Sequence, residues 1–242
     1  MHQLASEPGR PRLTWYGADS ERIELSGRVL DNWVTKVANL LVEEYEAGPD
    51  TRILVDLGPH WRTVVWALAA WRTGACVVLP ADGDRSTAVR VASECDIVVT
   101  SEPASHAGGG DLIAVPLAGL ARAWEGELPP GAVDGATAVM SHGDVLTWMP
   151  ETEPDSPAVE VDGTGATFAD LFGWAQAHAA DLPAGRRLVT TAADGAAVAL
   201  ATALNTYVED GSVVLCDPTV SAELAADPAR QGHLRATERI DG

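Results

Sequence analysis

The sequence predicts an α/β fold with mostly parallel sheets flanked by helices. Short runs rich in β-branched residues alternate, in both halves of the chain, with longer segments whose apolar residues recur at helical spacing. Short connections between these runs favour strand–helix–strand units with parallel strands. With 242 residues, 46% of them hydrophobic, the chain can bury a sizeable core. We expect two α/β lobes, residues 1–128 and 158–242, the second packed on the first, joined by an irregular connection over residues 129–157.

The first lobe should begin with two short strands and a long amphipathic helix. Residues 13–17 and 22–25 have strand patterns, and Ser26 can cap a helix that continues to Tyr45 and ends before a Gly-Pro pair. A Gly-Pro-His break then separates a buried strand from the next helix. The further elements expected in this lobe are a strand at 53–57, a helix at 61–73, a strand at 75–79, a helix at 86–94, and strands at 97–100 and 112–115.

The second lobe repeats the alternation after a connection rich in proline, glycine and acidic residues. Within the connection, only residues 136–140 have the pattern of a regular element. The second lobe should contain strands at 158–161, 187–191 and 212–216, helices at 167–180 and 196–207, and a short closing helix after Asp227.

Composition limits the classes of partner. The formal net charge of −19 repels both the nucleic-acid backbone and anionic lipid headgroups. No window approaches the roughly 18 consecutive apolar residues of a membrane-spanning helix, and the N-terminus has no apolar signal-peptide core. We therefore expect a cytoplasmic protein that binds neither nucleic acid nor membrane.

Cysteine, histidine and lysine usage limits the chemistry. Cys76, Cys95 and Cys216 are widely spaced and odd in number, so buried free thiols are expected rather than a disulfide framework. The six histidines lack metal-binding spacing, and no metal site is predicted. Lys36 is the only lysine, and its place beside the apolar stripe of its helix predicts a solvated side chain.

Three stretches carry a resemblance to a known superfamily. These are VANLL at residues 37–41, the helix-to-strand run WRTGACVVLP at 71–80, and the segment from Ala203 to Pro218. Their order resembles the N-terminal region of adenylate-forming enzymes, the AMP-binding acyl-CoA synthetases, luciferases and nonribosomal adenylation domains. The likeness extends over residues 13–240, and it is closest to a short actinobacterial family of unassigned function related to these synthetases.

The resemblance implies a phosphate-binding loop after the strand at 158–161. The superfamily loop reads T-S-G-T-T-G-x-P-K-G, in which backbone N–H groups, hydroxyls and a lysine hold the ATP phosphates. Here Gly163, Thr164, Gly165 and Thr167 preserve the small and hydroxyl character and are the candidate nucleotide-binding residues. Asp162 puts a carboxylate beside the expected phosphates, where like charges repel.

Other parts of the superfamily machinery have no counterpart in the sequence. The aromatic-G-x-T-E motif is absent, no lysine follows residue 36, and the ribose-binding Asp and the C-terminal lobe would lie beyond residue 242. The predicted function is therefore a truncated, catalytically degenerate relative that acts as a binding or regulatory module. The residues themselves assign no cofactor, and the resemblance implies an adenine nucleotide, CoA or an acyl compound as ligand.

Two other functions stay open. Arg186 and Arg187 could contact phosphates in an active ligase or transferase, alone or with residues of a partner chain. Alternatively, the eight tryptophans suit a structural protein that dimerises or docks on a complete synthetase. Trp61, Trp66 and Trp71 lie five residues apart on one expected helix, on different faces, so that some should meet the core and at least one should meet a partner or the second lobe.

Two histidines lie at positions that need a structural explanation. His60 follows the strand at 53–57, at the end of a parallel strand where α/β proteins bind ligands, so it is a pocket candidate. Capping of the next helix, or a solvated side chain, is the favoured alternative for His60. His142 lies in the run SHGD at 141–144, which has the letters of a hydrolase triad but is interpreted as a polar turn, since triads converge from distant segments.

Overall fold

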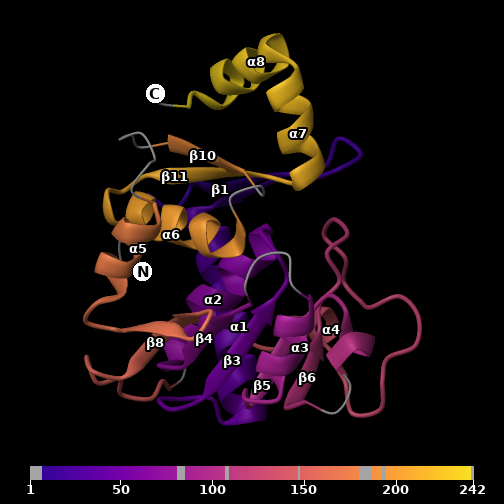
Figure 1. Ribbon diagram of the computed structural model, residues 1–242, viewed down its shortest axis with the longest axis vertical. Coiled ribbons are helices and arrows are strands. Elements are labelled where there is room, and N and C mark those ends of the chain that lie inside the picture. Colours follow the sequence, from indigo (N-terminus) through magenta and orange to yellow (C-terminus); the bar gives the residue numbers. More distant parts are fainter. Residues whose placement is uncertain are drawn as a thin grey trace. The chain divides into compact units, whose positions relative to one another are not determined.

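The structure is a computed structural model that describes residues 7–80, 85–106, 109–146, 148–179, 187–191 and 195–240, with only the backbone at 85, 86 and 187–191 (Figure 1). Its chain divides into two compact units. Unit 1 comprises Met1–Asp31, Pro59–Val64 and Phe172–Gly242, and unit 2 comprises Asn32–Gly58 and Val65–Leu171. The predicted α/β class is confirmed, because the larger sheet is mostly parallel and is accompanied by helices.

Unit 2 is built on a seven-stranded sheet with the order β7-β6-β5-β3-β4-β8-β9. All neighbouring strands in it are parallel except β8 and β9. Every residue of β4 and β5 is buried, as expected for parallel strands covered on both faces. The strands are β3 (Arg52–Asp56), β4 (Cys76–Leu79), β5 (Ile97–Thr100), β6 (Asp111–Ala114), β7 (Val133–Asp134), β8 (Pro157–Val161) and β9 (Thr164–Thr167). The helical elements that contribute to unit 2 are α1 (Gly27–Tyr45), α2 (Trp61–Thr73), α3 (Arg85–Ala92), the 3-10 helix η1 (Pro103–His106) and α4 (Gly135–Ser141).

Local capping explains where α4 begins. The carboxylate of Asp134 accepts hydrogen bonds from the backbone N–H groups of Ala136 and Thr137, at 3.0 and 3.2 Å. Because these N–H groups have no partner within the helix, an Asp at this position stabilises the first turn. The element predicted at 136–140 is thereby confirmed as a short helix.

Unit 1 contains a four-stranded sheet with the order β10-β11-β1-β2. Strand β1 (Pro11–Tyr16) pairs antiparallel with β2 (Arg22–Ser26) and parallel with β11 (Ser212–Cys216), which pairs parallel with β10 (Arg187–Thr191). Helix α6 (Gly195–Val208) contacts β10 and β11. The other helices of the C-terminal half are α5 (Leu171–His178), α7 (Pro218–Ala226) and α8 (Pro228–Glu238).

Helices α7 and α8 start with the same sequence device. Asp217 and Asp227 are the capping residues, and a proline follows each at the first helical position. The closing helix predicted after Asp227 is confirmed as α8, whereas α7 was not predicted. The Asp-Pro pair that ended the predicted strand at 216 is also a helix-start signal, and this second meaning was overlooked.

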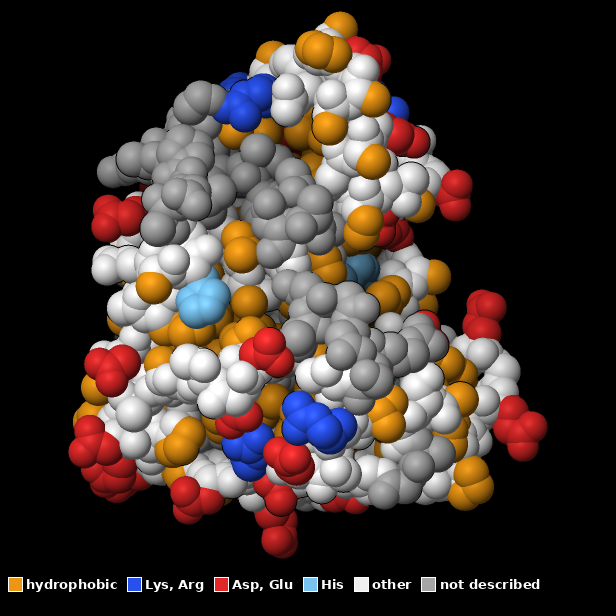
Figure 2. All heavy atoms as spheres, viewed as in Figure 1, with side chains coloured by type: hydrophobic (Ala, Val, Ile, Leu, Met, Phe, Trp, Pro, Cys, Tyr) orange, Lys and Arg blue, Asp and Glu red, His pale blue; other side chains and the backbone are white. Residues whose placement is uncertain are grey.

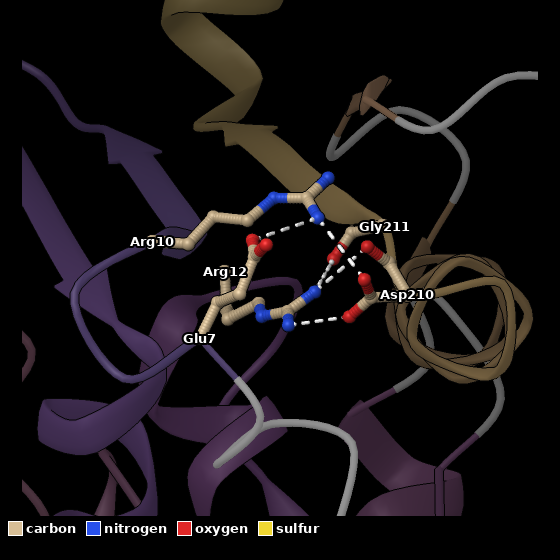
Figure 3. A network of polar contacts seen from close by, with 5 residues as sticks. All are labelled: Glu7, Arg10, Arg12, Asp210 and Gly211. Atoms are coloured by element: carbon tan, nitrogen blue, oxygen red, sulfur yellow. Dashed lines mark hydrogen bonds and ion pairs between the residues drawn. The ribbon is translucent and has the colours of Figure 1, made fainter.

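A buried arginine ties the first strand to the loop that precedes the last one (Figure 3). The guanidinium of Arg12 donates to the carbonyls of Asp210 and Gly211, at 2.8 and 3.0 Å, and to the carboxylate of Asp210, at 2.5 Å. The neighbouring Arg10 is more exposed and contacts the carboxylates of Asp210 and Glu7. Residues nearly 200 positions apart in the sequence are thus joined within unit 1.

Strand pairing distributes the chain differently from the predicted lobes at 1–128 and 158–242. The N-terminal strands β1 and β2 share a sheet with β10 and β11, and β8 and β9 extend the sheet of β3 to β6. Periodicity and turn signals locate strands along the chain but do not indicate which distant strands will pair. For this reason the order of elements was predictable while their grouping into sheets was not.

The three cysteine thiols are all buried, as predicted. Burial raises the pKa of Cys76 and of Cys95 to about 11, and that of Cys216 to about 12. In the described part of the chain, no helix combines the length and the apolar character needed to cross a membrane.

Candidate functional site

The carboxyl ends of β3 and β5 place two polar side chains side by side in unit 2. Asp56 and Thr100 are the last residues of these strands and are paired in register. The hydroxyl of Thr100 lies 3.5 Å from the Asp56 carboxylate and accepts a 2.9 Å hydrogen bond from the N–H of Glu102. In open α/β sheets this edge is where ligands are bound, so the two residues lie where a site is expected.

His106 from η1 completes this cluster. Its Nε2 lies 2.7 Å from a carboxylate oxygen of Asp56. The histidine side chain is 1% exposed, whereas the aspartate side chain is 25% exposed. The buried imidazole of His106 thus contacts the Asp56 carboxylate from the protein interior, and of the two side chains only the carboxylate is accessible to solvent.

The contact with Asp56 indicates which nitrogen of the His106 imidazole carries the hydrogen. Because an ionised carboxylate only accepts hydrogen bonds, Nε2 of His106 carries the hydrogen that points at Asp56. The other ring nitrogen, Nδ1, is buried and has no hydrogen-bond partner among the described residues. A histidine that orients a carboxylate at a strand end can hold a general base in place, or hold an acceptor for a hydroxyl or amino group of a ligand.

The segment predicted to bind phosphates has a different local structure from the one expected. Strands β8 and β9 form an antiparallel hairpin, in which Val161 pairs with Thr164 and Glu160 pairs with Gly165. The connecting residues Asp162 and Gly163 both have left-handed backbone angles, with φ of 54° and 73°. An Asp-Gly pair with two positive φ angles is the preferred two-residue hairpin turn. The expected strand–loop–helix arrangement at 158–180 was therefore wrong, because the turn signal was interpreted as a phosphate loop.

The other loop residues are used by this hairpin and by the turn that follows it. A side chain at Gly165 would have its Cβ 3.0 Å from the carbonyl oxygen of Val159, so the glycine allows close approach of the two strands. The hydroxyl of Thr167 donates to the carboxylate of Asp170 at 3.0 Å and accepts the N–H of the same residue at 3.3 Å. The helix begins only at Leu171. Nucleotide binding by Gly163, Thr164, Gly165 and Thr167 stays a prediction.

His60 caps helix α2 from inside unit 1. Its Nδ1 accepts the backbone N–H of Arg62 at 3.1 Å, and its ring packs edge-on against Trp15 with a centroid distance of 4.5 Å. The side chain of His60 is buried, so the capping role predicted as the alternative is the one that its contacts support. The guanidinium of Arg62 stacks on Trp61, and burial lowers the pKa of Arg62 to about 10, against the opposing effect of nearby Glu21.

The sequence predicted a solvated side chain for Lys36, but the lysine has a hydrogen-bond partner in the protein. Its Nζ donates to the carbonyl of His142 at 2.5 Å, within unit 2. The helix pattern placed the lysine beside the apolar stripe but could not indicate that residues 142–145 pack there. The polar turn predicted at 141–144 has a well-defined partner in α1, and His142 acts through its backbone and ring rather than as part of a triad.

The three tryptophans of α2 lie in the interior of the chain. Trp61, Trp66 and Trp71 are all buried, because α2 is apolar on most of its circumference. The indole N–H of Trp71 donates to the carbonyl of Ala158 at 2.7 Å. The sequence predicted that at least one of them would meet a partner or the second lobe; all three are buried within the chain, and the exposed tryptophan is Trp148.

Two predicted phosphate contacts cannot be placed. Arg186 lies outside the described residues, and for Arg187 only the backbone, in β10, is described. Among the described residues, no group of three or more His, Cys, Asp and Glu side chains is arranged to hold a metal ion.

Sequence comparison identifies the family. No protein-family model matches the chain. A Mycobacterium tuberculosis protein described as a "TIGR03089 family protein" is 38% identical over 193 residues, which are 78% of this chain and 75% of that protein. The chain belongs to the TIGR03089 family.

The fold of this TIGR03089 family member is similar to that of a solved Brucella canis acyl-CoA synthetase. The TM-score is 0.67 at 18% sequence identity, over 87% of this chain. The matched region is 41% of the synthetase, so the chain spans less than half of its length. The resemblance predicted from the sequence is thereby confirmed, and at this identity it is a statement about the fold.

The Asp56–His106 pair was not found from the sequence. The two residues are 50 positions apart, and their contact depends on β3 and β5 being neighbours in the sheet. A usable signal did exist, since Asp56 ends a buried strand immediately before the Leu57-Gly58 turn.

Proposed function

We propose that this protein is a catalytically degenerate relative of the acyl-CoA synthetases that serves as a binding or regulatory module rather than activating carboxylic acids with ATP. The proposal rests on the turn at Asp162 and Gly163, where the resemblance places the phosphate loop. A two-residue hairpin turn has no row of converging backbone N–H groups, and its first residue is an exposed carboxylate.

The distribution of positive charge supports the same conclusion. Phosphoryl and adenylyl transfer need concentrated positive charge at the reacting phosphate. The only lysine, Lys36, donates to a backbone carbonyl. Arg52, which contacts the hairpin, is engaged by both carboxylate oxygens of Glu160 in β8, at 2.7 and 3.3 Å. Neither cation is available to a triphosphate at the turn.

Calorimetric titration with ATP, AMP, CoA and a non-hydrolysable acyl-adenylate, followed by pyrophosphate exchange with a panel of carboxylic acids, tests the proposal. A binding module should bind at least one of these ligands without exchange above the enzyme-free rate. Exchange by the purified protein that scales with its concentration would overturn the proposal.

One substitution locates the ligand relative to the turn. If the phosphates approach Asp162, Asp162→Asn should strengthen nucleotide binding up to about fivefold, since a like-charge pair at 4 Å costs about 1 kcal/mol in water. Asp19→Asn is the matched control, because Asp19 is also exposed and has the same left-handed backbone, with φ of 55°. Equal affinity of both variants would place the nucleotide away from the hairpin.

The Asp56–His106 pair favours a second function, an enzyme that removes a proton from a bound water molecule or hydroxyl group, which then attacks a carbonyl carbon and releases the thiol of a thioester. Such a transferase or hydrolase would use Asp56 as the base, with His106 orienting it. Release of free thiol from a panel of acyl-CoA thioesters measures this activity. Asp56→Asn should abolish it and Asp170→Asn should not, and equal rates for the two variants would remove this candidate.

A further inference from the structure

Four large apolar side chains are exposed within nine residues of unit 2. Met140 is 49% exposed, Val145 70%, Leu146 37% and Trp148 65%, and we name them the 140–148 surface. The other exposed large hydrophobic side chains among the described residues lie singly along the sequence, which is normal for a protein surface. Four such side chains within nine residues are unusual for a protein surface, and clustered exposed apolar side chains mark interaction sites.

The backbone at residues 142–145, within this surface, is held by helix α1. The side-chain amide of Asn39 donates to the carbonyls of Gly143 and Val145, at 2.9 and 3.0 Å. Lys36, one turn earlier in the helix, donates to the carbonyl of His142. These three hydrogen bonds hold the loop while Val145 and Leu146 point to solvent. A pre-organised surface loses less conformational entropy on binding.

Carboxylates surround this loop. The two ring nitrogens of His142 lie 3.1 Å from a carboxylate oxygen of Glu43 and 3.7 Å from one of Glu44, and both glutamates are more than half exposed. Exposed Asp144 lies within the loop, and Glu151 follows it. Carboxylates are also spread over the face of the molecule drawn in Figure 2. Glu43, Glu44 and Asp144 thus place exposed carboxylates at this loop, while the ammonium group of Lys36 is held by the carbonyl of His142.

We propose that the 140–148 surface is a docking site for a cationic amphipathic segment of another protein, whose apolar side chains cover the surface and whose Lys or Arg side chains meet the carboxylates. Charge complementarity selects this occupant. A second copy of the chain carries the same net charge of −19 and is repelled, as are anionic lipids. The proposal does not depend on ligand binding at the sheet edge or at the hairpin.

The test uses the full chain and a fluorescent model peptide of about 18 residues, with leucines at helical spacing and lysines elsewhere. Fluorescence anisotropy measures its affinity for the wild type and for a Val145→Ser/Trp148→Ser double variant. Since Leu120 is 59% exposed and lies outside the surface, Leu120→Ser is the matched control. A shuffled peptide of the same composition and a peptide with glutamate in place of lysine test the pattern and the charge.

We expect the double variant to bind the model peptide at least about tenfold more weakly than the wild type, and Leu120→Ser to bind it within about twofold, because one factor of ten corresponds to about 1.4 kcal/mol of lost contact. The shuffled and acidic peptides should bind more weakly than the model peptide. Equal binding by the double variant and the control, or equal binding of all three peptides, would overturn the proposal. Concentration-dependent dimerisation lost in the double variant, or vesicle binding lost in it, would assign the surface to a second copy or to a membrane instead.

Discussion

Replacement of Arg12 by methionine is expected to weaken unit 1 in a measurable, local way. Methionine keeps much of the aliphatic volume of the fully buried arginine but removes its donors. The carbonyls of Asp210 and Gly211 then lose hydrogen bonds of 2.8 and 3.0 Å. The link that the Arg12 side chain makes between β1 and the turn before β11 is lost with them, while the backbone pairing of the two strands remains.

The magnitude follows from how each interaction is placed. A carbonyl left without its donor in the interior costs about 1–3 kcal/mol. The ion pair with the Asp210 side chain, which is 39% exposed, adds about 1 kcal/mol or less because water screens it. Relief of the buried charge offsets part of the loss. We therefore expect Arg12→Met to cost about 3 kcal/mol.

Arg10→Met is the control for this substitution. Arg10 has the same side-chain chemistry two residues earlier, but its ion pairs at 3.4 and 3.2 Å join partners that are 62% and 39% exposed. Pairs of this kind contribute about 0.5 kcal/mol. Comparison of the two variants thus separates the buried hydrogen bonds from the removal of a positive charge.

Hydrogen exchange followed by mass spectrometry is the suitable assay, since two units need not unfold together. Peptides from β1 and β11 should exchange about 100-fold faster in Arg12→Met, as about 3 kcal/mol implies, and no more than about fivefold faster in Arg10→Met, since its two pairs together contribute about 1 kcal/mol. Peptides from β3 and β5 serve as the internal reference. If β1 and β11 exchange equally fast in both variants, the buried hydrogen bonds do not have the assigned value.

Three further predictions concern the thiols, the hairpin and a helix cap. Because burial raises the pKa of Cys76 and Cys95 to about 11 and that of Cys216 to about 12, about one thiol in a thousand or fewer is ionised at pH 8; iodoacetamide should label them only after denaturation, and rapid native labelling seen by mass spectrometry would contradict this. Gly163→Ala should cost about 1 kcal/mol of stability and so lower the urea midpoint. Because φ is 73° and no atom lies within 4 Å of the added Cβ, the cost comes from the backbone and not from a clash, and an unchanged midpoint would refute the left-handed turn. Burial raises the pKa of Asp134, but hydrogen bonds from a threonine hydroxyl and from three backbone N–H groups outweigh burial and lower the pKa overall. The stability that the Asp134 carboxylate contributes is therefore present above about pH 4 and is lost as the pH falls through the lowered pKa. The cost of Asp134→Ala in urea titrations, about 1 kcal/mol at pH 7, should shrink in acid, and a cost that grows would contradict this.

Local rules predicted most elements of the chain because their causes are local. The strand at 53–57 and the helix at 61–73 correspond to β3 and α2, since β-branched runs and apolar spacing act within a few residues. The hairpin at Asp162 was mistaken for a loop although its Asp-Gly pair is a turn signal. In that case the resemblance to a family motif took precedence over turn chemistry.

The candidate site was less accessible to prediction. His60 was recognised as a residue of interest, but its burial between Trp15 and Trp61 comes from packing within unit 1. Lys36 and Asn39 were visible as polar residues on an apolar helix, and their shared role in holding residues 142–145 required knowledge of where that segment lies. Side chains that meet across long sequence separations leave no spacing to recognise.

The sequence by itself determined the α/β class, the net charge of −19, the single lysine, and the resemblance to adenylate-forming enzymes. Only the tertiary structure decided that β1 pairs with β11, that Asp56 meets His106, and that Val145 and Trp148 remain exposed. The reason is physical: propensity, capping and turn preference are properties of a few consecutive residues, whereas pairing and exposure depend on which distant surfaces exclude water from one another.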